Sequence, residues 1–165
     1  MSRYKMRQRM FSIGEDFTIE DESGNPAFEV DGKFMTLRET FELKDRQGNV
    51  VATIRGKLMS LRAKMDVFRG DEVVATITKA LFSPFGDKFQ VELAGGHELR
   101  VDGDLFDHEY TLRRDGSAVA QVSKRWFTFT DTYGIDIAPG EDDPLILAIA
   151  VALDEMSHDP DEGRG

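Results

Sequence analysis

The sequence predicts an all-β protein with one buried helix: a closed antiparallel barrel of about twelve strands around a central, hydrophobic C-terminal helix. Two observations lead to this fold class. Short runs rich in Val, Ile, Thr and Phe recur through residues 9–136 between turn signals, and a stretch without any polar residue follows at 145–153. No helical periodicity lies between the runs, so neighbouring strands are expected to pair antiparallel.

Alternating apolar and polar residues mark the expected strands. The pattern is clear at 41–44, 50–55 and 110–113, which is typical of half-buried strands. Gly and Asp in the turns, as in Asp45-Arg-Gln-Gly48, supply the positive φ angles that tight hairpins need. An open sheet of so many strands would have a long twisted edge, so the sheet is expected to close or to split in two. The strands are expected near residues 9–13, 16–20, 27–33, 37–44, 49–56, 61–68, 73–79, 87–93, 97–101, 108–113, 118–124 and 129–136.

The helix, expected at residues 144–153, favours closure. Asp142, Asp143 and Pro144 form a start signal, because acids and an early proline suit the first turn of a helix. A surface helix would have a polar face, and this one has none. It is also too short to cross a bilayer, which needs roughly 20 apolar residues. A barrel of about twelve strands has room for a helix along its axis, so the helix is expected there.

Length and composition predict one domain over residues 1–158 and a disordered acidic tail at 159–165. The net charge is −10, of which −7 falls on residues 141–165 and −3 on the rest. The absence of cysteine excludes disulfides and thiolate chemistry. The basic N-terminus lacks the apolar region of a secretory signal. A cytoplasmic protein is expected, with peripheral contact to a membrane as an option.

Six segments carry a resemblance to a known family. They include Phe106-Asp-His-Glu-Tyr110, Ser123-Lys-Arg-Trp-Phe127 and Asp131-Thr-Tyr-Gly134, together with 4–19, 24–33 and 141–148. In sequence and order these segments are similar to those of LURP-one-related proteins, over residues 3–157. The resemblance implies a tubby-like fold, in which twelve strands surround a C-terminal helix.

The same resemblance implies little about activity. Distant relatives include tubby domains, which bind phosphoinositide headgroups, and phospholipid scramblases. The headgroup-binding residues of tubby domains have no matching positions in this chain, so none is carried over. Scramblases have proline-rich and palmitoylated cysteine segments, which this sequence lacks, and this argues against lipid scrambling.

The sequence suggests no catalytic residue, metal site or cofactor. Its histidines, at 97, 108 and 158, are not at metal-ligand spacing. Asp107, His108 and Glu109 are consecutive, so in a strand the two acids would point away from the imidazole. A hairpin-end cluster with structural hydrogen bonds is therefore favoured over general acid–base chemistry. Asp102 and Asp104 extend this acidic stretch, but it lacks the calcium-loop pattern, so solvated turn acids are favoured over a cation site.

The most informative surface feature is a repeated apolar–basic connection, seen in Lys33-Phe-Met-Thr-Leu-Arg38 and again in Lys57-Leu-Met-Ser-Leu-Arg62. Alternate connections of an up-and-down barrel lie at the same end, so these bases are expected to surround one end as a "basic rim". The basic rim comprises Lys33, Arg38, Lys57, Arg62, Lys79, Lys88, Lys124 and Arg125.

Two interpretations of the basic rim remain open and are compatible. The cations could meet anionic headgroups while the neighbouring apolar side chains enter the membrane interface. Alternatively, the apolar side chains fold inward and plug the barrel, while Lys and Arg reach out to water. The plug is favoured, because a barrel that encloses an apolar helix must be sealed.

The function expected from the sequence is a non-enzymatic binding or scaffold module that binds anionic phospholipid headgroups. A protein–protein interaction platform without a lipid ligand is one alternative, and an unrecognised hydrolase is another. Nucleic acid ranks last, because no recognised motif occurs and the body of the chain is slightly acidic. The oligomeric state stays open. If the helix fills the barrel, the ligand must bind on the outer wall or at either end.

Overall fold

The computed structural model describes residues 2–7, 16–33, 40–56, 64–79, 89–126 and 132–157. These residues form twelve strands and one helix, α1 (Asp143–Ser157), as the sequence predicts. The strands are β1 (Ser2–Arg7), β2 (Phe17–Asp21), β3 (Pro26–Lys33), β4 (Thr40–Lys44), β5 (Val50–Gly56), β6 (Lys64–Arg69), β7 (Glu72–Lys79), β8 (Phe89–Leu93), β9 (Glu98–Asp104), β10 (Glu109–Arg114), β11 (Ser117–Ser123) and β12 (Thr132–Ile137).

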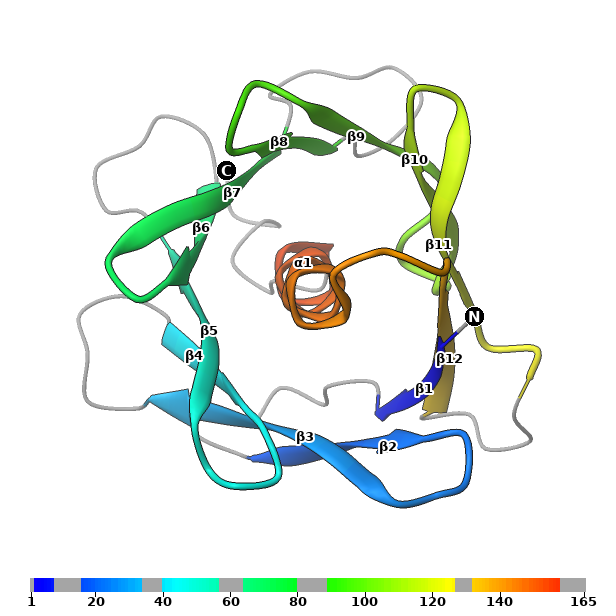
Figure 1. Cartoon of the computed structure of the whole chain (residues 1–165). Coiled ribbons are helices and arrows are strands. Elements are labelled where there is room, and N and C mark those ends of the chain that lie inside the picture. Colours follow the sequence, from blue (N-terminus) through cyan, green and yellow to red (C-terminus); the bar gives the residue numbers. More distant parts are fainter. Residues whose placement is uncertain are drawn as a thin grey trace, which may run out of the picture.

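The strands form a closed barrel. Consecutive strands pair antiparallel, and β1 pairs with both β2 and β12, which leaves no free edge in the strand order. The β1–β12 ladder runs from Ser2 opposite Ile137 to Arg7 opposite Thr132. Viewed along the barrel, α1 lies in the middle with strands on every side (Figure 1). The barrel with a central helix, predicted from periodicity, is therefore confirmed.

The first strand differs from its predicted position. A strand was expected at 9–13, which lies outside the described residues, and β1 instead spans Ser2–Arg7. Its basic residues resemble those of a solvated terminus. However, Arg3 and Lys5 alternate with Tyr4 and the fully buried Met6, which is the pattern of a half-buried strand. The tail at 159–165 lies outside the described residues.

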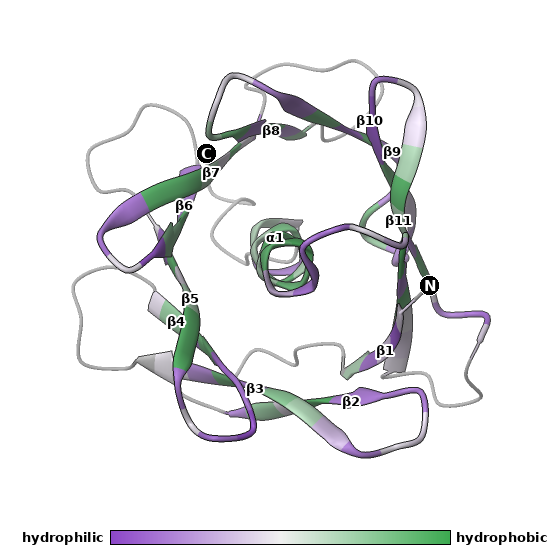
Figure 2. Cartoon of the chain, viewed as in Figure 1, coloured by the Kyte–Doolittle hydropathy of each residue, from purple (hydrophilic) through white to green (hydrophobic). Residues whose placement is uncertain are grey.

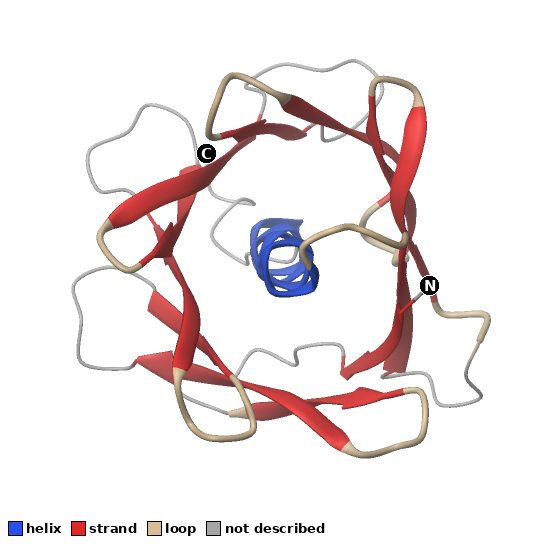
Figure 3. Cartoon of the chain, in the orientation of Figure 1, coloured by secondary structure: helices blue, strands red, loops and turns tan. Residues whose placement is uncertain are grey.

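Helix α1 is buried on all sides. Every residue from Ile146 to Leu153 is at most 1% exposed, which explains why this segment has no polar face. Figure 2 shows hydrophobic colour over most of the helix, and Figure 3 shows how the strands enclose it. Asp142 is the N-cap, because its Oδ1 accepts a hydrogen bond from the Leu145 N–H at 3.3 Å.

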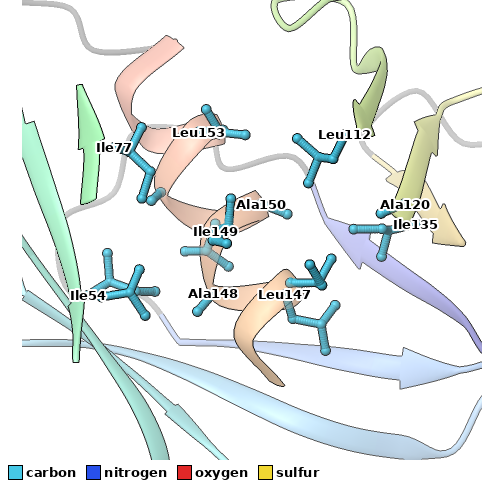
Figure 4. Packing of buried hydrophobic residues seen from close by; sticks show 14 of the residues in the cluster. Ile54, Ile77, Leu112, Ala120, Ile135, Leu147, Ala148, Ile149, Ala150 and Leu153 are labelled. Carbon is cyan, nitrogen blue, oxygen red and sulfur yellow. The ribbon is translucent and has the colours of Figure 1, made fainter. Parts of the chain in front are cut away.

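The interior of the barrel is filled. Inward side chains of the strands and those of α1 form one hydrophobic cluster. Figure 4 shows Ile54 and Ile77 on one side of α1, with Leu112 and Ile135 on the other. The helix lies nearest to β5, β6 and β7, where the small residues of β5 and β7 permit a close approach. A ligand cavity along the axis is excluded for the described part of the barrel.

Candidate functional site at the long-connection end

The barrel has two different ends, because the direction of the strands alternates. Five short turns, after β2, β4, β6, β8 and β10, lie at one end, and the segment between β12 and α1 starts there too. We call this the short-turn end. The connections after β1, β3, β5, β7, β9 and β11 belong to the opposite, long-connection end. Helix α1 enters at the short-turn end and ends at the long-connection end.

Four of the eight bases of the predicted basic rim are among the described residues, and all four belong to the long-connection end. Lys33 is the last residue of β3, Lys79 is the last residue of β7, and Lys124 and Arg125 directly follow β11. The strand ends on either side of the remaining four bases also lie at this end. Those four, Arg38, Lys57, Arg62 and Lys88, lie outside the described residues.

The turn after β11 is held in place by Glu109 at the start of β10. One carboxylate oxygen of Glu109 accepts hydrogen bonds from the Ser123 hydroxyl and the Lys124 N–H, both at 3.0 Å. The Ser123 Oγ in turn accepts the Arg125 N–H at 3.1 Å. Among the described residues, neither the Lys124 ammonium nor the Arg125 guanidinium contacts a carboxylate. This turn therefore presents two cations without an ion-pair partner in the described structure.

Trp126 does not plug the barrel. The guanidinium of Arg3 lies 4.6 Å from the centre of its ring, and Arg3 belongs to the outward side of β1. Two hydrogen bonds to Asp136 of β12, at 2.6 and 2.9 Å, fix Arg3 in that position. The plug interpretation is therefore wrong for Trp126. The planar guanidinium of Arg3 stacks on the indole ring while it binds the Asp136 carboxylate. This contact holds the Trp126 ring on the outer side of the barrel instead of in its interior. The aromatic residues at 34, 82, 85, 127 and 129 lie outside the described residues.

A buried polar cluster fastens α1 at the long-connection end. His108 is 1% exposed, and its Nε2 lies 2.6 Å from the Asp154 Oδ1 of α1. Its ring stacks on Tyr133 with a centroid distance of 4.2 Å. Burial and the nearby Asp154 carboxylate raise the pKa of Tyr110. His108 thus belongs to a hairpin-end cluster with structural hydrogen bonds, as predicted, and its imidazole is too enclosed to meet a substrate.

The acids of this region have separate partners. Asp102 binds Arg100 at 2.7 Å and Arg113 at 3.3 Å. Asp104 accepts the Asp107 N–H at 3.0 Å, as a turn cap does. The described residues include no group of three side chains placed to hold a metal ion. These contacts agree with the interpretation of the stretch as turn acids.

A cleft of about 720 Å³ lies on the outer wall over β8, β9 and β10. Its cations are Arg100 and Arg113, and both bind Asp102. Gly103 lies beside it, where an added Cβ would come within 2.4 Å of the Glu109 carbonyl oxygen. Three acids, Glu98, Asp102 and Asp115, line the cleft together with these two arginines, so the cleft has no excess of positive charge for an anionic ligand.

The two ends of the barrel differ in charge, which sequence reasoning missed. The turns of the short-turn end, counted with the residue on either side of each, carry ten acids and four bases. Arg69 binds Asp142 at 2.6 Å and Arg114 binds Glu141 at 3.1 Å, so two of the arginines hold the segment that leads into α1. The acids are Asp21, Glu22, Asp45, Asp71, Glu72, Glu98, Asp115, Glu141, Asp142 and Asp143, and the bases are Lys44, Arg46, Arg69 and Arg114.

Sequence reasoning also missed Phe106. It lies in the turn between β9 and β10, at the long-connection end, and its side chain is 67% exposed. No sequence signal distinguishes it from its neighbour Leu105, which is buried. The geometry of the turn makes Phe106 exposed, and the alternation of apolar and polar residues in the sequence does not predict this geometry.

In the described part of the chain, no helix combines the length and the apolar character that are needed to cross a membrane.

Comparisons with known proteins agree with the barrel. A family profile described as LURP-one-related matches residues 2–154. An uncharacterised protein of Bacillus subtilis (strain 168), YxjI, is 32% identical over 158 residues, which cover 95% of this chain and 94% of that protein. The X-ray structure of a protein from Arabidopsis thaliana superposes with a TM-score of 0.70 at 23% identity, covering 94% of this chain and 92% of the other. The last similarity concerns the fold.

Proposed function

Because the chain belongs to the LURP-one-related family and its barrel is filled by a helix, we propose that it is a non-enzymatic binding module whose long-connection end binds anionic phospholipid headgroups. The observation that carries this proposal is the pair of cations, Lys124 and Arg125, on a turn that Glu109 holds in place. Neither cation has an ion-pair partner among the described residues.

The filled interior supports binding at the surface. A lipocalin-like cavity is excluded where the inward side chains pack on α1. The buried position of His108 also argues against an acid–base site, which would need access to substrate. A ligand of this binding module is therefore expected to bind on the surface of the barrel.

The charge difference between the two ends supports an oriented approach to a negative surface. The ten acids at the short-turn end would be repelled, while the bases of the opposite end would be attracted. Asp104 and Asp107 lie at the long-connection end and oppose this attraction locally.

Vesicle co-sedimentation tests the proposal. We expect binding to rise as phosphatidylserine or a phosphoinositide is added to phosphatidylcholine vesicles, and to weaken as salt rises, because counterions screen the cations. Lys124→Glu with Arg125→Glu should weaken binding roughly 10-fold or more, since each cation near an anionic surface contributes about 1 kcal/mol. Lys57→Glu with Arg62→Glu should act in the same direction.

A matched control has the same change of charge elsewhere. Arg46→Glu with Arg100→Glu alters two exposed arginines, at the short-turn end and on the outer wall. This variant should bind anionic vesicles much more strongly than Lys124→Glu with Arg125→Glu. Equal binding of the native chain to neutral and anionic vesicles would overturn the proposal. A protein partner recovered without any response to lipid would favour the interaction platform.

A further inference from the structure

We propose that Phe106 is the apolar anchor of this membrane contact and inserts below the headgroups that the neighbouring cations bind. The inference rests on the proposed function and deepens it, because it names the part of the lipid that the turn between β9 and β10 would meet. Phe106 is the most exposed of the large hydrophobic side chains in the described structure, at 67%.

The turn keeps Phe106 outside while it fixes the residues on either side. Leu105 and His108 are both buried, and the His108 N–H donates to the Leu105 carbonyl at 3.1 Å. His108 is tied to Asp154 of α1, and the Asp107 N–H donates to Asp104. Phe106 is therefore presented from a fixed turn, so its insertion would require little ordering of the backbone.

The turn is also joined to the cationic turn after β11. Glu109, three residues after Phe106, accepts hydrogen bonds from Ser123 and from the Lys124 N–H. An exposed aromatic ring and two cations without a carboxylate partner in the described structure thus belong to neighbouring turns of one barrel end. Peripheral membrane binding uses this combination: the ring enters the acyl boundary while the cations meet the headgroups.

An exposed aspartate beside Phe106 gives the proposal a second, opposite test. Asp107 would face the same anionic surface and repel it, so Asp107→Asn should strengthen binding to anionic vesicles about twofold to fivefold. The substitution keeps the N–H that donates to Asp104, so the turn should be preserved.

Substitution of the ring tests the anchor directly. Phe106→Ser should weaken binding to anionic vesicles on the order of 10-fold, because the apolar gain of burying the ring is lost. Val73→Ser is the matched control: Val73 is an exposed hydrophobic residue at the short-turn end, and its loss should leave binding unchanged.

Fluorescence locates the side chain in the bilayer. The chain has one tryptophan, so Phe106→Trp in a Trp126→Phe background carries a single reporter. Its emission should shift to the blue with anionic vesicles and be quenched by brominated acyl chains. Val73→Trp in the same background should show neither effect. Circular dichroism of each variant checks that the barrel is retained.

The results separate the two proposals. If the native chain binds anionic vesicles but Phe106→Ser binds equally well and Phe106→Trp is not quenched, the anchor is wrong and the headgroup proposal stands. If the tryptophan is quenched in neutral and anionic vesicles alike, the anchor stands and the headgroup proposal is wrong. If no vesicle binds the native chain, both are wrong.

Discussion

His108 is the residue that links a surface turn to the core. Its backbone adopts the left-handed conformation with φ 54°, which is unusual for a residue other than glycine. Its imidazole stacks on Tyr133 and meets the buried carboxylate of Asp154, which lies in the C-terminal half of α1. A carboxylate near the negative end of a helix is unfavourable, so the contact with His108 offsets a local cost.

Removal of this imidazole should destabilise the barrel. His108→Ala leaves the Asp154 carboxylate buried with a contact missing, so the free energy of unfolding should fall by about 3 kcal/mol. Urea denaturation followed by circular dichroism measures it. His97→Ala is the control, because His97 is exposed in a short turn, and it should change stability by less than about 0.5 kcal/mol. Equal stability of the two variants would contradict the structural role.

The candidate site could be predicted only in part at this scale. The bases of the basic rim are visible in the sequence because they recur with the apolar residues of the connections. The contact between His108 and Asp154 joins residues 46 positions apart, so no local pattern announces it. Phe106 and Leu105 are adjacent and similar, and only the turn geometry makes one exposed and the other buried.

Helix α1 is the element on which the fold depends, and its start is fixed by side chains from two sources. Asp142 caps the helix and also binds Arg69 of β6 through both carboxylate oxygens. The hydroxyl of Tyr4 donates to Asp143 at 2.6 Å, and burial, together with this carboxylate, raises the pKa of Tyr4. Strands far apart in the barrel therefore hold the entry of the helix.

Two substitutions at Asp142 should separate capping from ion pairing. Asp142→Ala removes both and should lower the free energy of unfolding by about 1–2 kcal/mol. Asp142→Asn keeps a capping oxygen and loses the charge, so it should cost less than half as much, since exposed ion pairs contribute about 0–1 kcal/mol. Thermal melts of both variants give the comparison. If Asn proved as costly as Ala, the ion pair would be the larger contribution.

At the scale of elements the sequence was most informative. Strand periodicity and an apolar helix are local signals, because each depends on residues that are close in sequence. Eleven of the twelve strands overlap their expected positions. The exception, β1, is basic and resembles a solvated terminus, and its pairing with β12 and β2 shows it to be a strand.

The molecule as a whole is closed by β1, which lies between β12 and β2. Its ladder with β12 has six residue pairs, whereas its ladder with β2 has two. The seam with β12 also carries the bidentate contact between Arg3 and Asp136. Closure therefore depends mainly on the β1–β12 seam, and loss of β1 would leave two strand edges unpaired.

Two deletions test this account of closure. Deletion of residues 2–7 removes β1 and should produce a chain that aggregates or melts without cooperativity, because the edges of β2 and β12 and part of the core become exposed. Deletion of 159–165 should leave the melting curve unchanged, since these residues follow the last turn of α1. Size-exclusion chromatography and calorimetry compare both with the native chain. A soluble, cooperatively melting chain without β1 would contradict the account.

The β1–β12 seam also determines when the protein can fold during synthesis. Arg3 and Asp136 are 133 positions apart, so a ribosome must make all of the residues between them before their pairing can form. The helix that fills the barrel is made later still. The strands that are made early therefore cannot close into the barrel until α1 has emerged from the ribosome. Contacts between residues so distant in sequence generally make folding slow. A newly made chain would consequently expose its apolar inner face until α1 has been made, and chaperones would have that interval in which to bind it.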